Sequence, residues 1–205
     1  MKAWFRKGLM ALVTMVSLNG FAAQAPDELV KSVSNEVLEI VRKDQAIQRG
    51  DTSKAVALVE EKVLPHFDFR LMTSLAVGRD WRQATPEQRE KLVSAFRTLL
   101  VRTYSNALTE YRDQVIDFKP LRARPEDKDV TVRSEVRQPG AKPVDIDYAL
   151  EMQGDAWKVY DVAVAGVSLV TNYRSSFASQ IRQGGIDGLI SSLEAKNAEL
   201  GSKVQ

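Results

Sequence analysis

The sequence predicts an α+β fold in which helices come first, a curved antiparallel sheet of about four strands follows, and helices close the chain. Three observations predict this order. Apolar residues recur every three or four positions as far as about Asp113, alternate with polar residues between about Val115 and Ala165, and return to helical spacing beyond Gly166. Elements of both kinds that share one apolar interior indicate a cone-shaped α+β domain.

Residues 1–25 have the organisation of a secretory signal peptide. Basic residues precede an apolar run from Leu9 to Leu18, which is too short to span a bilayer and ends in small residues. We expect cleavage between residues 22 and 25. The remaining chain, residues 26–205, then forms one domain outside the cytoplasm.

The charge balance and the scarcity of reactive side chains exclude several classes of protein. The sequence has 29 Lys and Arg against 27 Asp and Glu, and removal of Lys2, Arg6 and Lys7 with the signal peptide leaves 26 against 27. This balance gives no reason to expect a nucleic-acid partner. One histidine and no cysteine rule out Cys-His catalysis and a multi-histidine metal site.

Four helices are predicted before the sheet, over residues 27–49, about 56–63, 67–77 and 86–113. The first begins after Pro26 and stops at Gly50. The second must end before Pro65, because a residue that precedes proline avoids the helical conformation. The start of the fourth helix is the best defined, since Thr85 is a suitable cap and Gln88 completes a capping box.

Four strands are predicted, near residues 115–121 and over about 130–136, 144–152 and 157–165. Turns at Pro139-Gly140 and Gly154-Asp155 separate the last three strands. The fourth strand carries apolar residues on both faces, which predicts a position in the middle of the sheet. After the sheet, Tyr173, Phe177 and Ile181 share one helical stripe. A break at Gly184-Gly185 precedes a last short helix.

Groups that could perform catalysis are sparse. His66 stands alone at a helix entrance, where a capping or surface role is the more common one. Asp145 and Asp147 share one strand face, which we interpret as a solvated outer face. The glycine-rich segment 184–188 lacks the preceding strand of a phosphate-binding loop. Apolar surface is instead abundant, but periodicity does not distinguish a filled core from a hollow one.

Four segments resemble the MlaC (toluene-tolerance Ttg2D) family in their order and spacing. They are Val63-Leu64-Pro65-His66-Phe67-Asp68-Phe69, the segment from Gly78 to Arg89, Trp157 to Val162 with Gly166 to Val170, and Asn172 to Phe177 leading to Gly185-Ile186-Asp187-Gly188-Leu189. Together they span nearly all of the chain after the signal peptide. One departure is Ala163-Val164-Ala165, which stands where many members have an acidic residue before the glycine.

The resemblance implies an NTF2-like fold with a deep apolar pocket that holds phospholipid acyl chains while the head group stays outside. It also implies a periplasmic carrier that moves phospholipid between an outer-membrane lipoprotein associated with porin and the substrate-binding ring of an inner-membrane ABC transporter. No cofactor and no covalent chemistry are implied. We expect a monomer.

The residues expected to line this pocket face inward on elements that must converge. They are Leu75, Val77, Phe96, Leu100, Tyr104, Tyr148, Val162, Val164, Val167, Val170, Tyr173, Phe177 and Ile181. For the head group we expect non-specific contact with at most one or two arginines, Arg79 and Arg174.

Two other functions are compatible with the same fold. An NTF2-like enzyme acting on a small apolar substrate would need an acid or base on the inward face of the sheet, where the third strand offers only Tyr148. A periplasmic adaptor or chaperone would have a filled core. Phospholipid in an organic extract of the purified protein would distinguish the carrier from both.

Overall fold

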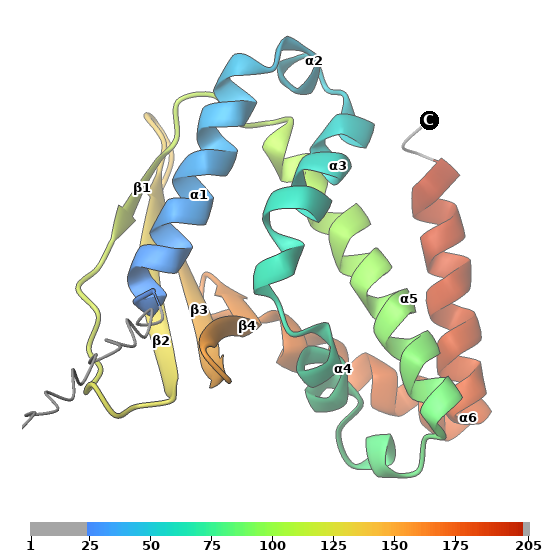
Figure 1. The fold of residues 1–205 in the computed structure, drawn as a ribbon. Helices are drawn as coiled ribbons and strands as arrows, with labels where there is room; N and C mark the ends of the chain where they lie inside the picture. Colours follow the sequence, from blue (N-terminus) through green and yellow to red (C-terminus); the bar gives the residue numbers. More distant parts are fainter. Residues whose placement is uncertain (1–23, 203–205) are drawn as a thin grey trace, which may run out of the picture.

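The structure, a computed structural model, describes residues 24–202. The predicted signal peptide, apart from its last two residues, lies outside these described residues. Helices and an antiparallel sheet are both present, which confirms the α+β class. Figure 1 shows α1 lying along the sheet on one side of the molecule, with α5 and α6 side by side on the other.

The first predicted helix is in fact two helices. α1 spans Pro26–Lys43 and α2 spans Gln45–Gln48. Asp44 interrupts them because its backbone is extended and its carboxylate accepts hydrogen bonds from the N–H groups of Ala46 and Ile47. An aspartate in this position caps a new helix in preference to continuing the old one.

The next two α-helices are short, and each is capped by an aspartate. α3 spans Thr52–Lys62, the 3₁₀ helix η1 spans Leu64–His66, and α4 spans Phe69–Val77. The carboxylates of Asp51 and Asp68 accept hydrogen bonds from the first turns of α3 and α4. α4 ends at Gly78, whose φ of 68° lies in the left-handed region that favours glycine.

The long helix α5 begins as predicted and ends earlier than predicted. The 3₁₀ helix η2 covers Gly78–Arg82, α5 covers Pro86–Tyr104, and the 3₁₀ helix η3 covers Ser105–Leu108. The Thr85–Gln88 capping box is present in both directions. Apolar spacing continues past Tyr104 because the tighter η3 turn keeps Leu108 on the inner side, so the sequence pattern hid the end of α5.

The sheet is antiparallel throughout, with its strands in chain order. Its strands are β1 Val115–Phe118, β2 Asp129–Arg137, β3 Val144–Gln153, β4 Ala156–Val164 and β5 Val167–Ser168. β5 was not predicted, because two residues are too few to show a period. β4 was expected in the middle of the sheet, but its outer neighbour is this two-residue strand. Its second apolar face is instead covered by residues of α4 and α6.

The last helix, α6, spans Leu169–Ser202 and is bent at Gly185, where φ is 69°. The bend coincides with the predicted break. Beyond it, Leu189, Ile190 and Leu193 are buried. Gln88 donates a 2.8 Å hydrogen bond to Asp187, which ties the bend to the start of α5.

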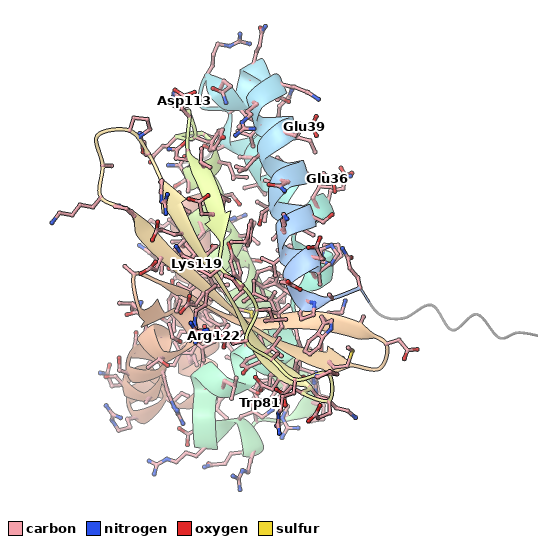
Figure 2. The ribbon with its side chains drawn as sticks, turned by 90° about the vertical axis from the view of Figure 1, so that its left-hand side faces the viewer. Glu36, Glu39, Trp81, Asp113, Lys119 and Arg122 are labelled. Atoms are coloured by element: carbon pink, nitrogen blue, oxygen red, sulfur yellow. The ribbon has the colours of Figure 1, made fainter. Side chains whose placement is uncertain are left out.

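Three separate groups of buried residues stabilise the fold. The helical core joins α4, α5 and α6, the sheet core lies between α1 and the strands, and the corner core joins α1, α2 and α3 to Tyr111. Figure 2 shows Glu36 and Glu39 projecting from α1 into solvent, while Val37 and Val41 on the same helix are buried. α1 therefore presents one apolar side to two cores.

Candidate functional site

An apolar cavity of about 580 Å³ lies between the three cores and is lined by residues that belong to or pack against each of them. Proteins usually bind small molecules in pockets of about 300–1,000 Å³. Its lining residues come from all the described helices and strands except α2, η2, β1 and β2. They are Val37, Val59, Val63, Leu64, Phe67, Phe69, Met72, Leu100, Val101, Tyr104, Ser105, Ala107, Leu108, Ile146, Tyr148, Val162, Val164, Val167, Leu169 and Asn172.

The position of the cavity follows from how the surrounding elements are held. Leu100 belongs to the helical core, Tyr148 packs against the sheet core, and Val37 belongs to the corner core. Phe67 touches both the helical and the sheet core, and its neighbour Asp68 donates a 2.9 Å backbone hydrogen bond to β4. Each element is thus fixed by contacts outside the cavity, so the cavity does not need its own side chains to fill it.

Few polar side chains line the cavity. None of the lining residues is charged, and the polar ones are Tyr104, Ser105, Tyr148 and Asn172. Burial raises the pKa of Tyr148, and the side chains of Ser134 and Ser34 partly offset this rise. This tyrosine is therefore neutral near pH 7. The cavity is suited to an uncharged, flexible apolar ligand.

The mouth of the cavity is marked by exposed apolar side chains. Tyr104 is 41% exposed, Val164 36% and Val167 57%, and all three line the cavity. Between the two valines, Ala165 and Gly166 both have positive φ, 50° and 79°. A two-residue hairpin turn of this kind needs that geometry, which costs a residue with a side chain, here Ala165, about 1–2 kcal/mol.

Six of the residues predicted to line a pocket do line this cavity. They are Leu100, Tyr104, Tyr148, Val162, Val164 and Val167. They come from α5, β3, β4 and β5, which the chain order alone does not bring together. The structure therefore places them on one surface; whether they contact a ligand stays a prediction.

The other seven predicted wall residues lie outside the cavity lining. Val77, Phe96, Val170 and Phe177 are buried in the helical core, Tyr173 and Ile181 pack against it, and Leu75 is 39% exposed on α4. The rings of Tyr173 and Phe177 lie edge-on to Phe96, with centroids 5.0 and 5.1 Å away. These side chains fill one another's space because α5 and α6 pack directly. An inward-facing apolar stripe on a helix can therefore either pack in a filled core or line a cavity.

The two arginines predicted for the head group also lie away from the lining. Arg79 is on η2, and its side chain is 90% exposed. The guanidinium of Arg174 lies beside Gly78, at the end of α4, where a positive charge is favourable. Figure 2 places the nearby Trp81 at the opposite end of the molecule from Asp113.

Several lining residues were missed by sequence reasoning. They include Val59 on α3, Val63 directly after α3, Phe67 after η1, and Phe69 and Met72 on α4, all of which line the cavity. A usable signal was present, since Val63, Phe67 and Phe69 fall inside the first motif that resembles the family. The helical period did not reveal Phe67, because η1 interrupts the helical register just before it.

Alternative sites are not supported by the described residues. Within residues 24–202 no three His, Asp or Glu side chains are grouped so that they could hold a metal ion. Burial lowers the pKa of His66, the residue at the end of η1. Asp145 pairs in register with Glu135 on the neighbouring strand, and neither lines the cavity. No helix in this part of the chain is long and apolar enough to cross a bilayer.

Comparisons with known proteins agree with this geometry. The family described as "MlaC protein" matches residues 31–195. The toluene tolerance protein Ttg2D of Pseudomonas putida is 28% identical over 183 residues, which are 89% of this chain and 85% of that protein. The intermembrane phospholipid transport system binding protein MlaC of Haemophilus influenzae is 24% identical over 198 residues, covering 95% and 92%.

A solved structure of a phospholipid-binding protein has a similar fold. It is the phospholipid-binding protein from Ralstonia solanacearum in complex with a phospholipid, which is 39% identical to this chain with a TM-score of 0.81. The match covers 87% of this chain and 99% of that one. Because the family match extends over most of the sequence and the fold agrees, this chain belongs to the MlaC family.

Proposed function

We propose that this protein is a non-catalytic carrier of phospholipid whose cavity holds acyl chains. The observation that supports this most directly is the uncharged wall of a cavity of about 580 Å³. Acyl chains gain about 0.8 kcal/mol for each methylene removed from water and need no hydrogen-bonding partner. A phospholipid-bound relative with the same fold supports the same ligand class.

The ligand is proposed to enter tail first through the mouth formed by Tyr104, Val164 and Val167. The head group then stays in water, where Asn172 is an exposed polar neighbour on the rim. Since no charged residue lines the cavity, we expect little discrimination between head groups. Arg79 and Arg174 are a weaker proposal for head-group contact, because neither is part of the lining.

The free energy gained by burial of the acyl chains determines how the lipid can leave the protein. A two-chain phospholipid has roughly 30 methylenes, so its transfer from water is worth on the order of 24 kcal/mol before other costs. Non-covalent affinities reach only about 18–21 kcal/mol, so escape of a free lipid into water is negligibly slow. The lipid is therefore handed over within a docked complex.

The proposed partners follow from family membership. They are the substrate-binding ring of an inner-membrane ABC transporter and an outer-membrane lipoprotein–porin complex. A periplasmic location fits both partners and the predicted signal peptide. An NTF2-like enzyme is less well supported, because among the lining residues Tyr148 and Tyr104 are the only ionisable groups.

The test is to export the full chain to the periplasm of a Gram-negative host, purify it, and extract it with organic solvent. We expect phospholipid in the extract. Labelled lipid should stay bound in lipid-free buffer and leave when the transporter ring is added. A lipid-free protein, or fast release into buffer without a partner, would rule out the proposal.

A further inference from the structure

The rim segment, defined as residues 165–172, connects β4 to the first turn of α6 and forms part of the mouth. Its Val167, Leu169 and Asn172 all line the cavity. A phospholipid that enters through the mouth must pass these side chains. The way this segment is attached therefore bears on how fast lipid exchanges.

The rim segment has few contacts with the sheet. β5 pairs with β4 at two positions, Ala163 with Ser168 and Val164 with Val167. β3, in contrast, pairs with β4 over eight positions. The separation of β5 from β4 thus breaks much less of the sheet than the separation of β4 from β3.

One carboxylate reinforces this weak pairing. Oδ1 of Asp161 accepts hydrogen bonds from the backbone N–H groups of Val162, at 2.8 Å, and of Val170, at 3.1 Å. Its Oδ2 accepts from the hydroxyl of Ser168, whose oxygen accepts in turn from the N–H of Thr171 at 3.0 Å. Asp161 on β4 therefore holds both β5 and the first turn of α6, which Ser168 caps.

The opposite end of the rim segment is a natural hinge. Ala165 and Gly166 carry positive φ angles, and a residue with a side chain is strained there. An opening of the turn relieves this strain. The Gly185 bend is a poorer hinge, since the helix on its far side is anchored in the helical core through Leu189 and through the Gln88–Asp187 hydrogen bond.

We infer that Asp161 is a positioning residue that holds the rim segment closed, and that lipid is exchanged when its β5 part swings away from β4 about the Ala165–Gly166 turn, while Val170 stays buried in the helical core. The inference rests on the proposed carrier function. It assigns the control of exchange to a side chain that is not part of the cavity lining.

The first test uses a reversible lock. Ala163 and Ser168 are register partners, whose Cα atoms in antiparallel pairs lie about 4.5–5.5 Å apart, within the range that a disulfide spans. The chain has no cysteine of its own, so A163C/S168C gives a single possible disulfide. The protein is loaded with pyrene-labelled phosphatidylglycerol, and transfer to excess phosphatidylethanolamine–phosphatidylglycerol vesicles is followed.

Oxidised A163C/S168C should transfer lipid more slowly than the native protein. The reduced form should transfer faster, because it has lost the Ser168 hydroxyl. Transfer by the oxidised protein at the native rate would overturn the inference. A native protein that takes up no labelled lipid would instead reject the proposed function, and the inference with it.

The second test separates positioning from general stability. Asp161→Ala should accelerate transfer about tenfold, the factor that corresponds to about 1.4 kcal/mol. Asp161→Asn should restore nearly the native rate, because its amide oxygen still accepts from both N–H groups and its NH₂ group donates to the Ser168 oxygen. Equal rates for the alanine variant and the native protein would contradict the assignment.

Discussion

Helix α5 takes part in two apolar regions, one filled and one hollow. Phe96 is fully buried in the helical core, in edge-on contact with Tyr173 and Phe177. One and two turns later, Leu100 and Tyr104 line a cavity of about 580 Å³. The two regions have similar side chains and differ in what faces them: α6 packs directly on the first, whereas the sheet and α3 stand away from the second.

This difference between the filled and hollow regions indicates which contacts stabilise each of them. The filled region is stabilised by its own side chains, so a smaller side chain leaves a void. The hollow region is held open by contacts behind it, such as the 2.8 Å hydrogen bond from Arg42 to Tyr111 in the corner core. Substitutions in the two regions should accordingly affect different measurements.

The largest effect on stability is expected for Phe96→Ala. Truncation of a buried phenylalanine costs about 3–5 kcal/mol, because the cavity left behind adds to the loss of burial. Denaturant unfolding of the lipid-free protein measures it, with Phe96→Leu as the matched control of smaller cost. A loss below about 1 kcal/mol would mean that this region is not filled as described.

The largest effect on lipid binding is expected for Val164→Glu at the mouth. A carboxylate there would face the acyl chains, and an unpaired charge in an apolar site costs several kcal/mol. The fold should survive, since Val164 is 36% exposed. Val115→Glu is the matched control, because Val115 is 54% exposed on β1 and does not line the cavity.

Bound phosphate per chain after extraction measures this effect. We expect it to be lost in Val164→Glu and retained in Val115→Glu, with unfolding free energies of both within about 1 kcal/mol of the native value. Full lipid content in Val164→Glu would place the acyl chains elsewhere.

A smaller effect on lipid binding, which should depend on acyl-chain length, is expected when the hollow region is partly filled. Ala107 is exposed and lines the cavity, so Ala107→Trp should occupy space there without displacing core residues. Long acyl chains should bind more weakly than short ones in this variant. Ala123→Trp, on the exposed connection between β1 and β2, is the control and should bind both alike.

The smallest effect is a loss of stability at alkaline pH. Burial raises the pKa of Tyr148 at the cavity, and burial together with a hydrogen bond to Asp129 raises the pKa of Tyr160 to about 12. The unfolded chain loses these protons near pH 10 while the folded protein keeps them, so stability should fall as pH rises from about 10 towards 12. Tyr160→Phe should weaken this dependence, and an unchanged slope would contradict it.

Local signals in the sequence were sufficient for most of the fold. The Thr85–Gln88 capping box and the turn at Gly154 depend on neighbouring residues, and both occur as predicted. Asp44 carried the signal for a break in the first helix, but the apolar spacing through Ile47 outweighed it. β5 has no local signal, because its two pairs with β4 depend on how the chain returns after Gly166.

The site could be predicted only in part. An apolar stripe indicates which side of a helix is buried, but it does not indicate which element, if any, packs against that side. Phe96 and Leu100 have the same spacing and sequence character, yet the first contacts Tyr173 and the second lines the cavity. Which element faces each residue depends on long-range packing. The lining residues on β3 and β4 were easier to predict, since the alternation of side chains along a strand assigns every second residue to the same face.

The central claim, that acyl chains occupy the hollow region and not the filled one, is tested most directly by a phospholipid with bromine atoms along its acyl chains. A crystal of the loaded protein should show anomalous scattering from bromine between Leu100 and Val162, with the rings of Phe96 and Phe177 still in contact. Bromine between α5 and α6, or none inside the protein, would contradict the account.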